Sequence, residues 1–322
     1  MAVNVDVLAP ETTGRPRSRP WAWAGRSRWV TAGLVIFAVF VFLGIFGSTL
    51  APYDPSALGS QVLAPPSAAH LLGTTQTGQD VLSQLLAGAG PTLEIGFMAG
   101  AVATALSIIV GVSAGYFGGS GGELLSLLSN IFLVIPGLPL LIVLTSYVPR
   151  PSSWVIALVL AVVGWAWGAR VLRAQTLALR QQDFVQAAKA SGESNLRIIL
   201  FEILPNEAAI VATSFVYTVI GAISFYVALC FLGIGNINIW SWGTMLFYAE
   251  SNQAITSGAW WWYVPPGIAV ALILLALVML NFGIDEFINP RLRAAGLTRR
   301  ELRSASREQG ITPVLANRRR PR

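Results

Sequence analysis

The sequence predicts an all-α integral membrane protein with six transmembrane helices and both termini in the cytoplasm. Of the 322 residues 54% are hydrophobic and only 11% are charged, against about 25% charged in a typical soluble domain. The apolar residues gather in blocks of about twenty, which is the length a helix needs to cross about 30 Å of hydrocarbon. Arginine is concentrated in the segments on one side of these blocks.

Six apolar blocks are predicted to cross the membrane, and none contains Asp, Glu, Lys or Arg. Helices are expected because lipid offers no partner for an unpaired backbone group, and the alternation typical of barrel strands is absent. The alternative, buried helices of a large soluble protein, requires polar faces that these blocks lack. The blocks are 29–51, 95–117, 124–148, 154–169, 208–232 and 262–280.

Basic residues set the predicted orientation. The tail 1–28 and the loop 170–207 each hold five Lys or Arg residues, and the C-terminal segment 281–322 holds ten. Only Arg150, of 21 in total, lies on the other side, so both termini are expected in the cytoplasm. The basic tails 1–28 and 289–322 are expected to be solvated and attracted to anionic lipid headgroups, so the charge indicates a membrane surface and no nucleic acid.

Two classes of energy source are excluded by residue types. The only lysine, Lys189, is followed by Ala190, so the chain lacks the Gly-Lys-Ser/Thr of a P-loop ATPase. Ion-coupled carriers place ionisable residues in the membrane, and the six blocks have none. Cys230 and His70, each the only residue of its type, lie on different segments, which excludes a metal site or a nucleophile pair built from these two types. Either another subunit powers the protein or it is a passive pore.

The cytoplasmic segment 183–205 separates these two classes. Asp183 is expected to cap a helix of about two turns, with Gln186 reaching back in a capping box and Gly192 ending the helix. A second helical stretch, 194–204, leads to Pro205 at the start of the fifth block. A short capped helix with a small apolar surface fits a groove on a partner, but an ordinary loop on the membrane surface remains the alternative.

This segment resembles the coupling loop of ABC-importer permeases. The spacing from Gln186-Ala187-Ala188 to Gly192 and on to Leu204-Pro205 matches that loop, whereas Gln186 stands where Glu is usual and Glu202 where peptide transporters usually have His. The loss of charge at Gln186 puts a salt bridge to the ATPase in doubt, while docking is still expected. The resemblance implies an ATPase-coupling role for Asp183, Phe184, Val185, Gln186, Ala187, Ala188, Lys189, Ala190, Gly192, Leu204 and Pro205.

Further motifs narrow the resemblance to the C-type permease subunit of the dipeptide/oligopeptide/nickel importers. Each is weak alone, but they occur in the expected order and spacing, with Gln79 replacing a usual Arg. They are the segments 50–55, 70–74, 78–83, 231–235, 241–243 and 289–293.

The resemblance implies the rest of the machine and its place in the bacterial inner membrane. A type I importer permease fold is expected, in which this chain and a second permease subunit form the pore as a heterodimer. Two ATPase domains would bind ATP and Mg, and an extracytoplasmic solute-binding protein would deliver the substrate. This chain would then be a non-catalytic subunit with no cofactor of its own. Short peptides are the expected substrate; nickel, another small solute and a passive channel are the alternatives.

The fifth block carries a polar and aromatic stripe at helical spacing. Such a face should turn away from lipid, toward either the translocation pathway or the partner permease. Its members are Ser214, Tyr217, Thr218, Gly221, Ser224 and Phe225.

Other features predict packing and the outer surface. The pairs Gly96/Gly100 and Gly111/Gly115 predict close helix packing in the second block, and Pro136 and Pro139 should bend or break the third.

A short amphipathic helix at 80–86 is expected to lie along the interface within the outer loop 52–94. The five later blocks and the coupling loop form the predicted permease core, 95–288. The tryptophans of the second outer loop are expected to anchor in the headgroup region, with contact to the solute-binding protein as the alternative; they are Trp240, Trp242, Trp260 and Trp261.

Overall fold

The computed structural model describes residues 28–148 and 152–288. Within these ranges the regular secondary structure is helical, apart from one isolated bridge between Thr74 and Asp80. The elements in chain order are α1 Arg28–Leu50, α2 Val81–Phe117, α3 Gly119–Val134, α4 Gly137–Ser146, α5 Ser153–Leu179, α6 Asp183–Ala190, α7 Asn195–Arg197, the π-helix η1 Ile198–Ile203, α8 Leu204–Phe231, α9 Trp242–Ser251 and α10 Trp260–Ile288.

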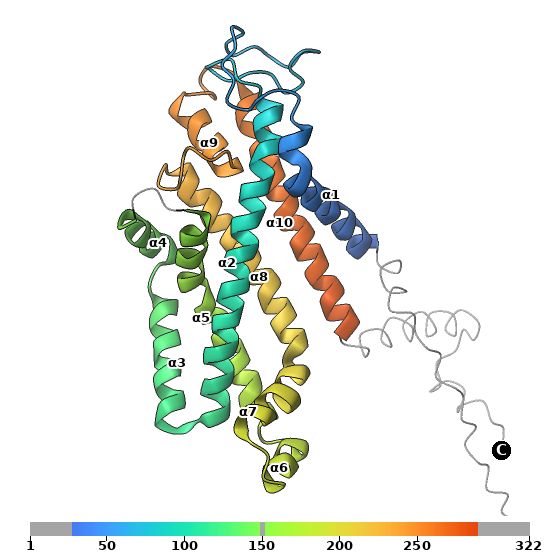
Figure 1. Cartoon of the computed structure of the whole chain (residues 1–322), viewed down its shortest axis with the longest axis vertical. Coiled ribbons are helices and arrows are strands. Elements are labelled where there is room, and N and C mark those ends of the chain that lie inside the picture. The colour runs from blue at the N-terminus through green and yellow to red at the C-terminus, as the bar shows by residue number, and fades with distance from the viewer. Residues whose placement is uncertain (1–27, 149–151, 289–322) are drawn as a thin grey trace, which may run out of the picture.

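The described residues confirm a multi-pass helical membrane fold (Figure 1). Five helical units are long and apolar enough to cross a membrane, namely α1, α2, α5, the continuous α7–η1–α8 unit and α10. The bent pair of α3 and α4 makes a sixth span if it is counted as one. The predicted tails 1–28 and 289–322 lie outside the described residues, except for Arg28 at the start of α1.

The third predicted span, 124–148, is divided into two helices. The axes of α3 and α4 differ by 91°, and the break falls at Pro136, which precedes α4. Pro136 cannot continue a helix because it lacks an N–H and its ring clashes with the preceding turn. Pro139 lies in the first turn of α4, where a backbone N–H has no helical partner in any case. The predicted break is therefore confirmed and is due to Pro136.

Helix α2 corrects the prediction for the outer loop. The segment 80–86, expected as an amphipathic helix on the membrane surface, forms the first turns of the 37-residue α2. Asp80 is the N-cap residue, and its carboxylate accepts hydrogen bonds from the Ser83 N–H at 2.8 Å and the Ser83 hydroxyl at 2.7 Å. The Nδ1 atom of His70 lies 2.8 Å from the same carboxylate. This buried cap starts the helix fourteen residues before the predicted block and shortens the outer loop to 51–80.

Close packing along α2 confirms the small-residue prediction. A Cβ at Gly96 or Gly100 would collide with Ile223 or Val219 of α8. On α2's other contact face, a Cβ at Gly111 would collide with the backbone of α5, and α2 packs against α5 more extensively than against any other helix. Glycine therefore allows α2 to approach both neighbours closely.

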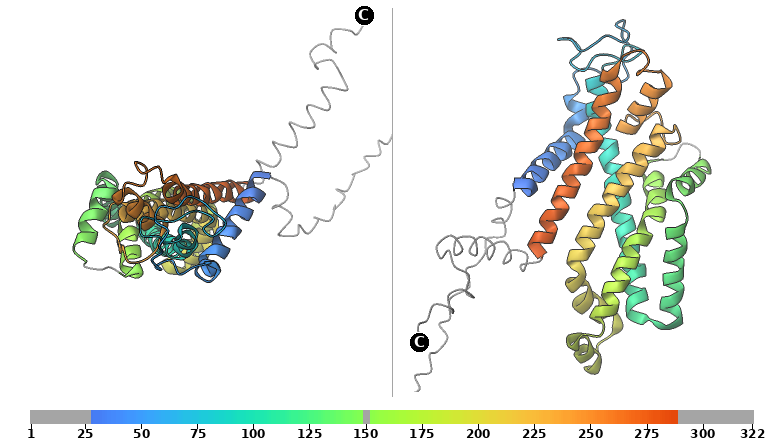
Figure 2. Two further views of the ribbon diagram at one scale, coloured as in Figure 1. Left: turned by 90° about the horizontal axis from the view of Figure 1, so that it is seen from above. Right: turned by 180° about the vertical axis from the view of Figure 1, so that it is seen from behind.

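The two ends of the molecule differ. The 51–80 loop and α9 lie at one end, and α6 and α7 at the opposite end (Figures 1 and 2). At the first end the expectation of a headgroup anchor is corrected for Trp242, and for the other three tryptophans it stays a prediction. Trp242 is buried, and its indole donates to the Leu85 carbonyl at 3.0 Å. The indoles of Trp240 and Trp261 donate to the 51–80 loop, and Trp260 is exposed.

Candidate functional site

The short helix predicted in segment 183–205 forms, as α6, but is capped differently. Gln182, not Asp183, is the N-cap residue, and no side chain caps the helix. Gln186 Nε2 donates to the Arg180 carbonyl at 2.7 Å, so the expected capping box is wrong. Asp183 in the first turn and Lys189 in the last turn instead complement the helix dipole. The helix ends two turns later at Ala190, in agreement with the prediction.

Gly192 ends the helix through a left-handed backbone conformation. Its φ is +78°, which a side chain with a Cβ adopts only at a cost. The N–H of Gly192 donates to Lys189 O at 3.0 Å and the N–H of Glu193 to Ala188 O at 3.2 Å, the hydrogen-bond pair of a Schellman motif. The chain thereby reverses sharply between α6 and α7.

Contacts with α2 and the start of α7 hold α6 in place. The Nζ atom of Lys189 lies 5.0 Å from the ring centroid of Tyr116 at the end of α2. The Tyr116 hydroxyl donates to Asn195 Oδ1 at 2.9 Å, and Arg180 Nη1 donates to the Gly115 carbonyl at 3.1 Å. Val185 is fully buried with Val112, Tyr116, Leu172, Ile198 and Ile203. Segment 183–205, called the coupling segment below after its predicted role, is therefore anchored to the helices α2 and α5.

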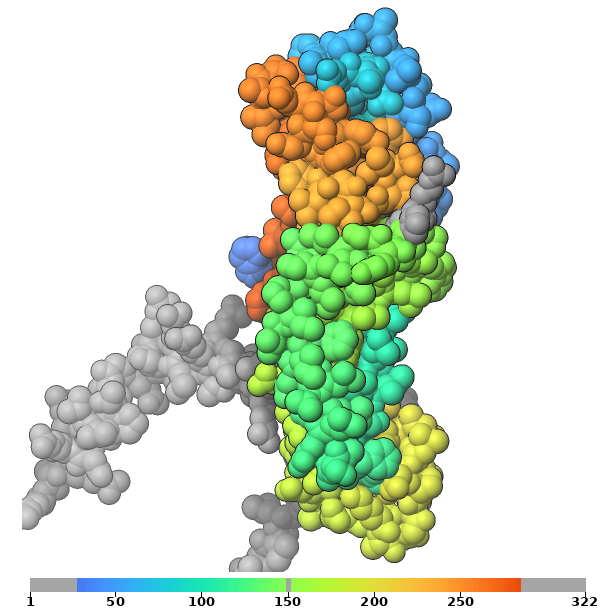
Figure 3. Space-filling model, turned by 90° about the vertical axis from the view of Figure 1, so that its left-hand side faces the viewer, coloured from blue at the N-terminus to red at the C-terminus, as the bar shows by residue number. Residues whose placement is uncertain are grey.

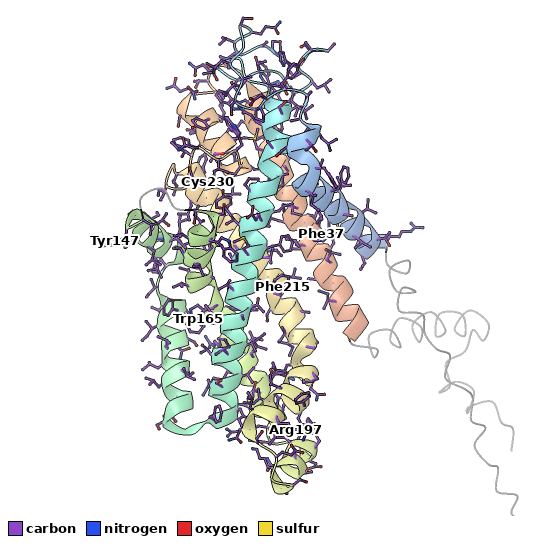
Figure 4. The ribbon with its side chains drawn as sticks, viewed as in Figure 1. Phe37, Tyr147, Trp165, Arg197, Phe215 and Cys230 are labelled. Carbon is purple, nitrogen blue, oxygen red and sulfur yellow. The ribbon has the colours of Figure 1, made fainter. Side chains whose placement is uncertain are left out.

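The outer face of the coupling segment carries exposed apolar side chains. Phe184 is 40% exposed, Leu196 66% and Phe201 67%. Arg197 of the same face is labelled at the tip of the molecule in Figure 4 and forms an ion pair with Glu193. The remaining exposed residues of α6 are Asp183, Gln186, Ala187, Lys189 and Ala190.

Ala188 does not lie on this outer face. It is half-buried and packs against the cluster that contains Val185. Its small size is therefore needed at least partly by the protein's own core, while its ATPase-coupling role stays a prediction. Sequence spacing could not separate the two alanines because they are adjacent on a short helix.

A buried carboxyl group that sequence reasoning missed lies just above the coupling segment. Leu204 and Pro205 open α8, with the proline in its first turn. Glu207 follows and is fully buried, and its Oε1 accepts a hydrogen bond from the Thr176 hydroxyl of α5 at 2.7 Å. The fifth predicted block starts at 208, directly after this residue, so a carboxylate at the border of an apolar block is the available signal.

A cavity of about 620 Å³ lies between α3, α4, α5 and α8. Four stripe residues, Tyr217, Thr218, Gly221 and Phe225, line it. The other two do not: Ser214 is buried, and Ser224 is exposed with its hydroxyl donating to Ile220 O at 2.8 Å. Figure 3 shows the face formed by α3 and α4, between α9 and the α6–α7 end.

The cavity wall opposite the stripe comes from segments that the sequence did not single out. The Trp167 and Tyr217 rings both line the cavity and contact each other edge to face, with their centroids 6.1 Å apart. Phe132 of α3 and Gly137 of α4 also line it, and the bend at Pro136 lies between these two residues. The break in the third span therefore borders the cavity.

Comparison with known proteins identifies the family. A family model described as "Binding-protein-dependent transport system inner membrane component" matches residues 107–294. The chain belongs to this family. It is thus an inner-membrane, multi-pass component of a binding-protein-dependent transport system, as the motifs predicted.

Relatives of this transport component are similar over most of their length. The dipeptide transport system permease DppC of Bacillus subtilis (strain 168) is 32% identical over 278 residues, covering 85% of each chain. The oligopeptide permease OppC of Lactococcus lactis subsp. cremoris (strain SK11) is 30% identical, covering 80% of this chain and 88% of its own. The di/tripeptide permease DppC of Pseudomonas aeruginosa (strain UCBPP-PA14) is 31% identical, covering 87% and 94%.

A solved structure shows the same fold. One chain of the MetNI methionine ABC transporter superposes with a TM-score of 0.51 at 18% identity, covering 64% of this chain and 94% of its own. The all-helical architecture of an importer permease is therefore confirmed for this transport component.

Proposed function

We propose that this chain forms half of the translocation pathway of an ATP-driven importer of short peptides. The curated relatives named above are peptide permeases. The cavity next to the bend at Pro136 has a volume typical of ligand sites and is lined by four residues of the α8 stripe. A second permease subunit would complete the pathway. The 1–28 and 289–322 tails and the α6–α7 end would lie in the cytoplasm, and the 51–80 loop would face the solute-binding protein.

The proposal rests mainly on the α6–α7 end, the tip of the molecule, which carries exposed apolar side chains and is held against α2 and α5. Phe184, Leu196 and Phe201 are exposed at the end of the molecule that the arginine distribution assigns to the cytoplasm, where large apolar side chains together indicate a docking surface. The anchors Lys189–Tyr116 and Tyr116–Asn195 would carry motion of the tip into α2. Partner ATPases would bind ATP and Mg there, and this chain would have no catalytic residue.

The experiment compares two exposed phenylalanines at the same end of the molecule. Phe201→Ser should abolish co-purification of the ATPase and ATP-dependent peptide uptake in vesicles, because a polar side chain weakens apolar docking. Phe117→Ser, at the end of α2 and outside segment 183–205, is the matched control, as Phe117 is also exposed. Normal uptake in Phe201→Ser would contradict the proposal. Peptide flux without ATP would support a passive channel, and ATP-driven uptake of nickel alone would leave the coupling intact but replace the substrate.

A further inference from the structure

A second cavity lies at the opposite end of the molecule from the coupling segment. It has a volume of about 440 Å³ and is enclosed by the 51–80 loop, the start of α2, the 232–241 connection, α9 and the start of α10. Its volume falls in the range of about 300–1,000 Å³ typical of small-ligand sites. The stripe residues of α8 do not line it, so it is separate from the cavity between α3, α4, α5 and α8.

Hydrogen bonds between its lining residues build this cavity. The Trp240 indole donates to Ser56 Oγ at 3.0 Å and ties the 232–241 connection to the 51–80 loop. Gln84 Nε2 donates to Gln79 Oε1 at 2.9 Å and to the Pro55 carbonyl at 3.2 Å, which ties α2 to the 51–80 loop. The Trp240 ring packs against Tyr248 with centroids 5.8 Å apart. The walls are therefore held before any ligand enters.

Two lining residues have buried polar atoms without a partner. Gln84 is 1% exposed and its Oε1 accepts no hydrogen bond, while Trp262 is 3% exposed and its Nε1–H donates none. Leaving such a group unpaired is energetically unfavourable. One unmet acceptor and one unmet donor are complementary to a peptide amide, which offers an N–H and a C=O. Gln76, Asn238 and Asn252 add further amides, and the lining residues include no charged side chain.

We infer that this cavity binds a short peptide through a backbone amide, before the peptide enters the translocation pathway. The inference rests on the proposed peptide transport and adds an entry site to it. Small rotations of the covered Gln84 and Trp262 side chains would present Oε1 and Nε1–H to the ligand. Because the lining lacks charge, the site recognises the interior amide of the peptide and leaves its charged ends outside.

The test is saturation-transfer NMR on the complex purified through a tag on this chain, without the solute-binding protein or ATP. The ligand is N-acetyl-trialanine amide, which has amides but no charged ends. The wild-type complex should give a signal, and Trp262→Phe, which removes only the indole N–H and part of the ring, should weaken it at least threefold. Trp260→Phe is the matched control, because Trp260 is exposed and does not line the cavity.

A second variant keeps the inference testable if Trp262→Phe does not fold. Asn238 is exposed at the lip, so Asn238→Trp should close the cavity and abolish the signal without disturbing the buried packing. Equal signals in wild type, Trp262→Phe and Asn238→Trp would overturn the inference, as would no signal in wild type. The inference would also be overturned if these variants changed only the capture of the solute-binding protein and left the peptide signal unchanged. The occupant of the cavity would then be a loop of that protein. ATP-driven peptide uptake, measured separately, tests the proposed function independently.

Discussion

The Thr176 hydroxyl of α5 donates a hydrogen bond of 2.7 Å to the Glu207 carboxylate of α8, and both side chains are fully buried. This bond joins the two membrane helices that flank the coupling segment. Its position at the root of α8 makes it part of the connection between the α6–α7 tip and the membrane core.

Removing the Thr176 hydroxyl should destabilise the protein. Thr176→Val leaves the Glu207 carboxyl without its partner in a buried environment, which costs about 1–3 kcal/mol. The measurement is the thermal unfolding midpoint of the full-length chain in detergent. Thr256→Val is the matched control, because Thr256 is exposed and bonds only within its own turn. Equal midpoints for the two variants would show that the α5–α8 bond contributes nothing to stability.

A side chain at position 192 should weaken coupling without unfolding the protein. At a φ of +78°, a valine side chain at position 192 destabilises the backbone conformation by roughly 1 kcal/mol or more. The turn between α6 and α7 should therefore change its conformation, and ATPase co-purification should fall about fivefold. Gly121→Val is the control, since neither position has an atom within 4 Å of an added Cβ but only Gly192 has a positive φ. Wild-type ATPase co-purification and substrate-stimulated hydrolysis in Gly192→Val would argue that 183–205 is only a connecting loop.

Adding one methyl group between α2 and α8 should be costly. Gly100→Ala places a Cβ against the Val219 side chain and backbone, and such overpacking costs about 1–3 kcal/mol. The yield of monodisperse protein and its unfolding midpoint should both fall. Gly267→Ala, whose Cβ meets nothing within 4 Å, should behave as wild type. If both variants are equally stable, α2 and α8 do not pack as closely as described.

Two adjacent residues of the fifth-span stripe, Ser224 and Phe225, should respond differently to an introduced charge. Phe225→Asp introduces a carboxylate into the 620 Å³ cavity and should reduce peptide uptake at least tenfold, while the complex still assembles. Ser224→Asp lies on the exposed face of the same turn, so it should instead impair association with the second permease. Uptake assays and co-purification of the partner separate these outcomes. The assignment of the stripe would be reversed if Phe225→Asp lost the partner and Ser224→Asp lost only uptake.

Sequence alone is enough to predict the membrane class, the apolar blocks, the break at Pro136 and the two-turn helix that Gly192 terminates. These features depend on local chemistry: block length, the missing proline N–H and the freedom of glycine. The length of α2 was not predictable, because its start depends on Asp80 being buried against His70 and Ser83.

Which side chains share a face or a cavity depends on how the helices pack. Ala187 and Ala188 are equivalent in sequence, but packing against Val185 turns Ala188 inward. The stripe of α8 could be predicted from its helical spacing, but the rest of the cavity wall comes from α3, α4 and α5, which are distant in the sequence. The unpaired atoms of Gln84 and Trp262 could be recognised only in three dimensions, because a hydrogen-bond partner is a property of position and not of residue type.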